Sequence, residues 1–186
     1  MIEKEVKIVV EQPPINQLKE LLDRDLKFLN IEHQEDIYFN FIYRNFKMSD
    51  EAVRIRINDK GIELTYKGPK FNSSLKAREE ITISVNDLDK TIHFLDRLGF
   101  YPVITIKKTR INYLDDSFLI SLDLVDNLGQ FIEIEAIHEI EDEKIHTYVN
   151  DFIRKYKIRG KLTTKSYLEL LIEKNEKNSS SNSNTY

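Results

Sequence analysis

The residues best suited to chemistry begin at the N-terminus, where Glu3, Glu5 and Lys7 alternate with mostly apolar residues. In an extended chain, residues i, i+2 and i+4 point to one side, so these three side chains share a face. Charges placed in the same way return in most of the later strand-like segments. They are Arg54 and Arg56, Lys67, Arg78 and Glu80, Lys108 and Arg110, Asp123, and Glu133 and Glu135.

Both signs of charge in one pattern indicate a site for a polyanion together with metal ions. Lysine and arginine bind phosphate oxygens, and carboxylates bind Mg²⁺ or Mn²⁺ through oxygen. In any single strand, alternating charge is more often a solvated face with cross-strand ion pairs. Its recurrence in several strands favours an internal site, because buried charges are costly unless they are paired or coordinating.

Strands are the main elements that must position these residues. Alternation and β-branched or aromatic residues predict eight of them. These expected strands cover residues 2–11, 34–43, 52–58, 62–67, 76–85, 103–113, 117–125 and 130–137. Apolar residues at helical spacing predict a helix after Pro13-Pro14, through Leu18, Leu21, Leu22 and Leu26, and further helices at 87–98, 141–157 and 164–174.

The predicted fold is α+β and mainly β: a closed eight-stranded antiparallel β-barrel that forms a tunnel, with helices packed on its outside. The helices need an apolar sheet face, which turns the charged strand faces toward the lumen. A barrel of this size can hold a ligand. We expect one domain over residues 1–174 and a disordered Asn/Ser-rich tail over 175–186. The segment 69–75 is expected to be a surface loop or a lid.

Composition narrows the class of protein. The 186 residues are 40% hydrophobic and 32% charged, with a net charge of -4, so the chain can bury a core but is not basic like many nucleic-acid binders. The absence of cysteine excludes disulfides and thiolate metal sites. The N-terminus does not resemble a signal peptide, and no apolar run approaches about 20 residues. We therefore expect a cytoplasmic protein without membrane or nucleic-acid partners, either monomer or homodimer.

The charged motifs stand in the order of a known family. The chain resembles the CYTH family, the triphosphate tunnel metalloenzymes, which includes class IV adenylyl cyclases, thiamine triphosphatases and inorganic triphosphatases. The resemblance covers residues 1–172. It rests on Glu3–Lys7, Arg54–Arg56, Leu64–Lys67, Arg78 with Glu80, Lys108–Arg110, Asp123, Gly129–Glu135 and Lys165–Leu168.

The resemblance implies a division of labour among these residues. Triphosphate contacts are expected from Lys7, Arg54, Arg56, Lys67, Arg78, Lys108, Arg110 and Lys165. Binding of Mg²⁺ or Mn²⁺ is expected from Glu3, Glu5, Asp123, Glu133 and Glu135. Glu3 or Glu5 is the candidate catalytic base that orients the attacking water.

The same triphosphate machinery serves several reactions. Cyclisation of ATP also needs an adenine pocket and a ribose 3′-OH in line with the α-phosphorus; the segment 34–39 resembles the bacterial cyclase branch, but no adenine pocket is identifiable. Hydrolysis of inorganic tripolyphosphate makes the smallest demand on the chain. We therefore predict a metal-dependent triphosphatase acting on tripolyphosphate. The alternatives are a class IV adenylyl cyclase, producing cyclic AMP and pyrophosphate, and a non-catalytic polyphosphate or nucleotide binder.

Overall fold

The alternating N-terminal residues form strand β1 (Ile2–Gln12), which has more partner strands than a usual sheet strand. In the computed structural model, which describes residues 2–70 and 76–182, β1 pairs antiparallel with three other strands. These partners are β5 (Lys76–Val85), β8 (Gly129–Ala136) and β9 (Arg159–Thr163).

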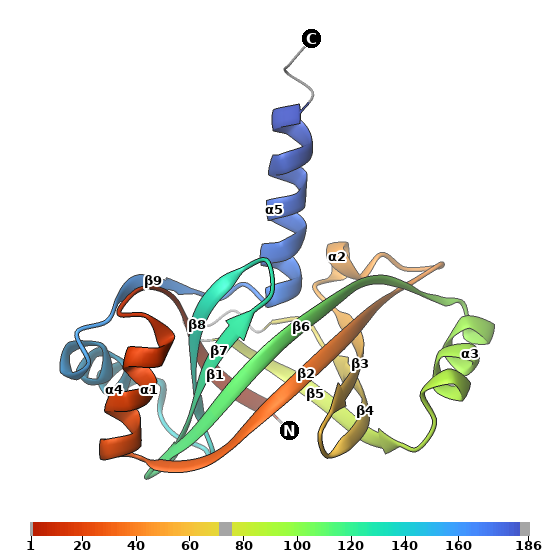
Figure 1. The fold of residues 1–186 in the computed structure, drawn as a ribbon. Coiled ribbons are helices and arrows are strands. Elements are labelled where there is room, and N and C mark those ends of the chain that lie inside the picture. The colour runs from red at the N-terminus through yellow and green to blue at the C-terminus, as the bar shows by residue number, and fades with distance from the viewer. Residues whose placement is uncertain (1, 71–75, 183–186) are drawn as a thin grey trace.

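The remaining strands complete one antiparallel sheet (Figure 1). They are β2 (Lys27–Phe41), β3 (Ala52–Asn58), β4 (Gly61–Lys67), β6 (Phe100–Asp115) and β7 (Phe118–Val125). The order across the sheet is β5-β4-β3-β2-β6-β7-β8-β1-β9, with an additional pairing between β5 and β1. Most neighbours in this order are joined by hairpins, so the charged rows of successive strands lie side by side.

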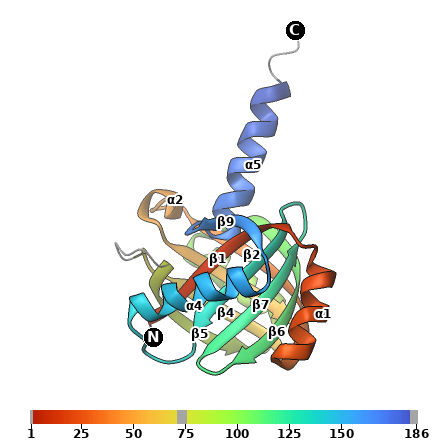
Figure 2. The same cartoon turned by 90° about the vertical axis from the view of Figure 1, so that its left-hand side faces the viewer.

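The predicted class, mainly β with helices, is confirmed, but hydrogen bonds between the described residues do not close the sheet into an eight-stranded barrel. Strands β1 and β5 pair at only four positions, from Ile2 opposite Glu79 to Glu5 opposite Lys76. From Lys7 onward β9 pairs with β1 instead. The sheet therefore curves round on itself, as Figure 2 shows, while its seam is a short ladder that ends where β9 begins.

Strand β9 was not predicted, because its five residues are mostly polar and show little alternation. Gly160 explains how it fits. A Cβ at this position would lie 2.2 Å from the carbonyl oxygen of Val9, so only glycine allows the two backbones to approach this closely.

Strand β2 begins at Lys27, earlier than the expected start at residue 34. Its first residues are largely exposed and carry a weak pattern, but β6 pairs with β2 from Lys27 opposite Leu114 to Phe41 opposite Phe100. The partner strand therefore extends β2 beyond what its own sequence indicates. The short helix α2 (Phe46–Ser49), capped by the Asn45 side chain, was also missed.

Helices cover the outer, apolar faces of the sheet, as predicted. Helices α1 (Ile15–Asp25) and α4 (Asp142–Lys155) lie over the outer faces of β1, β7 and β8 (Figures 1 and 2). Their main core cluster includes Val6, Ile8, Leu18, Leu22, Ile120, Leu122, Ile132, Ile134, Ile145 and Val149.

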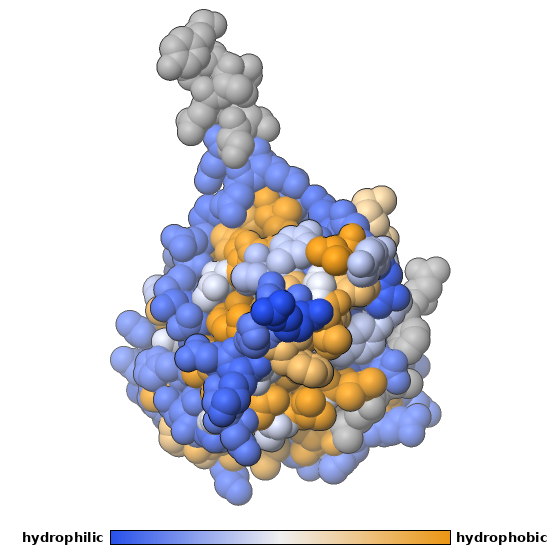
Figure 3. Space-filling model, turned by 90° about the vertical axis from the view of Figure 1, so that its right-hand side faces the viewer, coloured by the Kyte–Doolittle hydropathy of each residue, from blue (hydrophilic) through white to orange (hydrophobic). Residues whose placement is uncertain are grey.

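Helix α3 (Leu88–Leu98) packs Leu95 against β3 on another side of the sheet. The Asp87 side chain caps its N-terminus, and the helix ends at Gly99, whose φ is 95°. The surface that carries α3 mixes apolar and charged residues (Figure 3), and the helix itself exposes Phe94 and Leu98. Within the described residues, no helix has the length and apolar character needed to cross a membrane.

Helix α5 (Tyr167–Asn182) stands out from the sheet in Figure 1. The segment from Asn175, expected to be disordered, continues this helix as far as Asn182, and residues 183–186 lie outside the described part. The segment has no apolar pattern, but a helix already begun at Tyr167 extends without a new nucleation cost. Most of the predicted 69–75 lid also lies outside the described residues, and the domain boundary at residue 174 stays a prediction.

Candidate functional site

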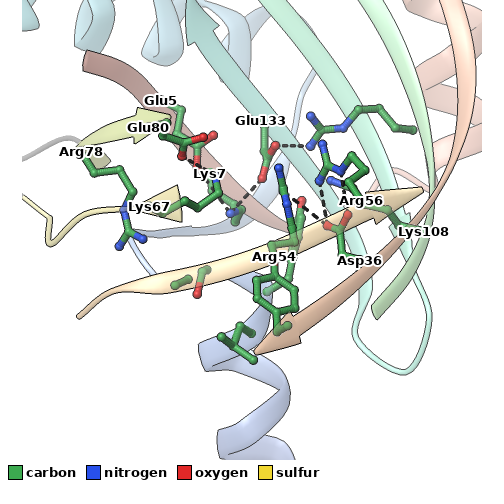
Figure 4. Close-up of a pocket in the computed structure, with 16 residues that line it drawn as sticks. Glu5, Lys7, Asp36, Arg54, Arg56, Lys67, Arg78, Glu80, Lys108 and Glu133 are labelled. Carbon is green, nitrogen blue, oxygen red and sulfur yellow. Dashed lines mark hydrogen bonds and ion pairs between the residues drawn. The ribbon is translucent and has the colours of Figure 1, made fainter. Parts of the chain in front are cut away.

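The charged inner faces of the strands converge on one cavity of about 90 Å³. Seven cationic and four acidic side chains line it, and the close-up in Figure 4 shows them pointing into the same space. They are Lys7, Arg54, Arg56, Lys67, Arg78, Lys108, Arg110, Glu5, Asp36, Glu80 and Glu133. The excess of cations suits an anion with several charges.

One wall of the cavity is the β2–β3 clamp, made of Asp36, Arg54 and Arg56. Arg56 donates from Nε to Asp36 Oδ1 and from NH2 to Oδ2, both at 2.7 Å. Arg54 NH1 lies 3.5 Å from Asp36 Oδ2. Burial alone would raise the pKa of Asp36, but the charges of Arg54 and Arg56 outweigh it and hold that pKa well below its ordinary value. Asp36 is therefore an anion that orients two permanent cations.

The neighbouring wall is the β6–β7 clamp, made of Asp123, Lys108 and Arg110. Arg110 donates from Nε to Asp123 Oδ1 at 2.7 Å and from NH2 to Oδ2 at 2.5 Å. Lys108 Nζ lies 3.0 Å from the same Oδ2. Burial, together with the charge of Arg110, lowers the pKa of Lys108 to about 7, although Asp123 opposes the shift.

The acidic side of the cavity lies on β1 and β8. Their register places Lys7 opposite Glu133 and Glu5 opposite Glu135. Lys7 Nζ, which is almost fully buried, lies 2.8 Å from Glu133 Oε1 and 3.6 Å from Glu5 Oε1. Arg110 also pairs with Glu133. The carboxylates are thus balanced by cations that also face the cavity.

Beyond the two clamps and Lys7, two further cations of the cavity, Lys67 and Arg78, lie on β4 and β5. Lys67 pairs with Glu80, and Arg78 NH2 lies 3.3 Å from Asp50 Oδ1. The Nε atoms of Arg54 and Arg78 are buried and have no hydrogen-bond partner among the described residues. Buried donors of this kind are costly unless a partner satisfies them, and both atoms can donate to an anion bound in the cavity.

The predicted metal ligands fit a divalent cation by chemistry, since all are carboxylates. Glu5 and Glu133 are buried at the cavity and Glu135 is half-buried beside them. The backbone of Glu3, in β1, pairs with that of Arg78, in β5, but the structure does not describe the Glu3 side chain. Among the described residues, no three acidic or histidine side chains are grouped tightly enough to hold a metal.

Two predicted site residues have other partners in this structure. Lys165 directs its Nζ to Glu173, at 2.6 and 2.8 Å, and is half exposed instead of facing the cavity. Asp123 accepts four hydrogen bonds, three from its clamp and one from the Tyr167 hydroxyl at 2.7 Å. Its oxygens are therefore occupied by cations and a hydroxyl, and its role as a metal ligand stays a prediction.

Sequence reasoning gave no role to two residues of the site. Asp36 was considered only as part of the segment 34–39, which resembles the bacterial cyclase branch, although an acid between Gln34 and Tyr38 on one strand face was the available signal. Tyr167 belongs to a motif that was considered for its lysine, yet it is the tyrosine that lines the cavity. Burial, reinforced by Asp123, raises the pKa of the Tyr167 hydroxyl well above its ordinary value, so this group remains a donor.

A second, more apolar cavity of about 420 Å³ adjoins the charged one. The two share Ala52, Arg78, Ser166 and Leu168 in their linings. The second cavity is further lined by Phe39, Asn40, Phe46, Val103 and Ile172. Polar and charged residues also line it, among them Asn45, Lys47, Asp50, Glu51, Glu169 and Glu173. Its volume is typical of small-molecule sites.

The comparisons with known proteins agree with this geometry. The family model for the CYTH domain matches residues 1–167. "Putative adenylate cyclase MJ0240" from Methanocaldococcus jannaschii is 39% identical over 175 residues, which cover 91% of this chain and 98% of that protein. The structure of the PH1819 protein from Pyrococcus horikoshii OT3 has a TM-score of 0.80 and 37% identity, covering 92% of this chain and 99% of that one.

A plant protein shares the fold at lower identity. The structure of HpAC1 from Hippeastrum, described as a "putative adenylyl cyclase" that reveals a dominant triphosphatase activity, has a TM-score of 0.71 and 17% identity. It covers 89% of this chain and 93% of its own. At this level of identity the likeness shows the fold alone.

Proposed function

Since the chain belongs to the CYTH family, whose members generally use divalent metals, we propose that it is a metal-dependent triphosphatase. The favoured substrate is inorganic tripolyphosphate. The observation that carries the proposal is the cavity lined by seven cations from five strands, with carboxylates on one side. A purely phosphate-binding protein would use the cations but has little need for Glu5 and Glu133 in the same space.

The two clamps and Lys7 bind the polyanion in this proposal. A triphosphate brings oxygens that accept hydrogen bonds from the unpartnered Nε atoms of Arg54 and Arg78. Arginine and lysine fixed around the phosphoryl groups also stabilise the charge that develops during transfer, and they are already oriented by Asp36 and Asp123. The protein therefore contributes mainly position and charge.

Glu3, Glu5, Glu133 and Glu135 would hold Mg²⁺ or Mn²⁺. A divalent ion bound there supplies charge neutralisation to the phosphoryl oxygens and favours ionisation of water. Glu5 is our candidate for the residue that orients the attacking water, since it is buried at the cavity and its Oε1 lies 3.6 Å from Lys7 Nζ. Glu3 is the alternative base.

Release of phosphate from tripolyphosphate with Mg²⁺ or Mn²⁺, compared with a chelated sample, tests this function. Wild-type protein should release phosphate only with metal. Glu5→Gln should keep the binding of tripolyphosphate and lose most turnover, with Glu35→Gln, on the outer face of β2, as a matched control. Turnover of Glu5→Gln equal to that of the wild type would remove Glu5 from the mechanism, and binding without any release would leave a binder only.

Cyclisation of ATP is the second candidate, and the apolar cavity favours it. That cavity adjoins the phosphate site through Arg78, so a triphosphate bound among the cations could place a nucleoside against Phe46 and Val103. Incubation with ATP and metal discriminates the two reactions. Cyclic AMP with pyrophosphate identifies a cyclase, whereas ADP or AMP with phosphate or pyrophosphate identifies a hydrolase.

A further inference from the structure

Tyr167, the first residue of α5, lies at the charged cavity and has no part in the reaction proposed above. Its side chain is buried, with a residue exposure of 5%. Lys7 Nζ lies 4.2 Å from the centre of its ring, and Lys108 Nζ lies 4.9 Å from it. One ring therefore contacts a lysine from β1 and a lysine from β6.

Both distances are within the roughly 6 Å over which the face of an aromatic ring attracts an ammonium group, and the attraction is strongest away from water. Each lysine also has a carboxylate neighbour, Glu133 for Lys7 and Asp123 for Lys108. These carboxylates lie on different strands. The ring is the contact that the two lysines share, in addition to these separate ion pairs.

The Tyr167 hydroxyl fixes the ring in this place. It donates to Asp123 Oδ2 at 2.7 Å, and Lys108 approaches the same oxygen at 3.0 Å. The ring also packs edge to face against Phe131, with 4.9 Å between ring centres. Packing against Phe131 requires only an apolar ring, and does not account for the hydroxyl on Asp123.

We propose that Tyr167 is a positioning residue, which sets the separation of the Lys7 and Lys108 ammonium groups so that both meet oxygens of one polyphosphate. The proposal rests on the proposed function, because it concerns the same cavity. It also gives the first turn of α5 a role in the site, in place of the role predicted for Lys165. Tyr167 acts through the lysines and is not expected to touch the reacting atoms.

The free protein already allows a test. Protons held over the face of an aromatic ring are shifted upfield in NMR spectra, so the ε-methylene signals of Lys7 and Lys108 should be upfield of those of other lysines. Tyr167→Leu should abolish this shift, whereas Tyr167→Phe, which keeps the ring but loses the hydrogen bond that fixes it, should retain only part of it. Phe131→Leu, which replaces the neighbouring aromatic ring by the same aliphatic side chain, should leave the upfield shift of the lysine signals unchanged. Signals of Lys7 and Lys108 at ordinary positions in the wild type would overturn the proposal even if Tyr167→Leu failed to fold.

Binding of tripolyphosphate in a metal-free buffer, measured by calorimetry, gives the functional arm. Tyr167→Leu should weaken binding by about tenfold, Tyr167→Phe should weaken it less, and Phe131→Leu should remain close to the wild type. Equal losses in Tyr167→Leu and Phe131→Leu would reduce Tyr167 to a packing residue and overturn the proposal. Since this assay contains no metal, its outcome is separate from phosphate release: a protein that binds but does not hydrolyse refutes the proposed function and leaves Tyr167 testable.

Discussion

The β2–β3 clamp and the β6–β7 clamp share one plan but differ in one cation. Each has an aspartate that binds an arginine on the neighbouring strand through two hydrogen bonds, Asp36 with Arg56 and Asp123 with Arg110. In both clamps a second cation lies two residues from the arginine. That cation is Arg54 in the first clamp and Lys108 in the second.

The difference matters because arginine stays charged and a buried lysine does not. Burial would lower the pKa of Arg54, but the negative charge of Asp36 outweighs it and raises that pKa above its ordinary value. For Lys108, burial prevails and lowers the pKa to about 7. The first clamp is therefore a fixed pair of charges. The second clamp can lose a charge near neutral pH. Among the contacts of the described residues, the Tyr167 hydroxyl bonds to this clamp and not to the first. Two walls with nearly the same geometry thus have different electrostatic behaviour.

The largest expected effect comes from removing the anion of each clamp. Asp36→Asn leaves two permanent buried cations without their partner, which should cost about 3–5 kcal/mol in the free energy of unfolding. Asp123→Asn should cost less above pH 7, because Lys108 can lose its proton. Urea unfolding of both variants at pH 6 and pH 9 measures the comparison.

The pH dependence in that experiment has a definite sign. A lysine whose folded pKa lies below its unfolded value of about 10.4 binds fewer protons in the folded state, so the free energy of unfolding rises with pH between the two values. Loss of the carboxylate lowers the pKa of Lys108 further. The deficit of Asp123→Asn relative to wild type should therefore shrink from pH 6 to pH 9, and that of Asp36→Asn should stay constant. Parallel deficits would show that the two clamps are electrostatically alike.

The next effect is on catalysis. Arg56→Gln and Arg110→Gln should each lower kcat/KM for tripolyphosphate by about 10²–10³, because each removes a fixed donor aimed at the phosphoryl groups. Lys107→Gln, on β6 but on the outer face, is the control for a lost charge and should remain near wild type. If only one arginine variant were impaired, a single wall would bind the substrate.

A smaller effect, on the pH dependence of binding, distinguishes Lys108 from Arg54, the second cations of the two clamps. Tripolyphosphate should bind Lys108 in its charged form, so binding takes up a proton above pH 7 and affinity falls, by at most about tenfold per pH unit. Lys108→Arg should remove this part of the pH dependence. Calorimetry in buffers of different ionisation enthalpy measures the proton uptake, and the difference between the two proteins cancels protons taken up by the ligand itself. Identical uptake in both proteins would contradict a neutral Lys108 in the free site.

The smallest effect is expected at Lys165. Its ammonium pairs with Glu173 on the surface, and such pairs contribute at most about 1 kcal/mol. Lys165→Ala should keep kcat/KM within about twofold, as should Lys161→Ala on the neighbouring strand β9. A loss of more than tenfold at Lys165 alone would return this residue to the phosphate site, as the family resemblance implied.

Much of the inner face was predictable, because alternation is a local property. Glu5 and Lys7 on one side of β1, with Val6 and Ile8 on the other, follow from the period of an extended chain. The same reasoning correctly turned Arg54 and Lys108 inward. Local pattern does not state which acid meets which cation, so the role of Asp36 was missed: it depends on the register between β2 and β3.

Features that depend on distant pairing were the least predictable. The seam between β1 and β5 is short because β9 takes over the edge of β1, and β9 itself depends on Gly160 meeting the backbone of Val9. The direction of Lys165 is set by Glu173, eight residues later on α5. Both outcomes result from packing between elements, which the spacing of residues within one element does not encode.

The central claim is that both clamps bind one triphosphate inside the curved sheet. A crystal structure of the protein with tripolyphosphate and Mn²⁺, located by its anomalous signal, tests this most directly. We predict phosphoryl oxygens within hydrogen-bond distance of Arg56 and Arg110 in the same molecule, with Mn²⁺ beside Glu5 and Glu133. Tripolyphosphate bound on the outer surface, with the cavity unchanged at near-saturating ligand, would contradict the account.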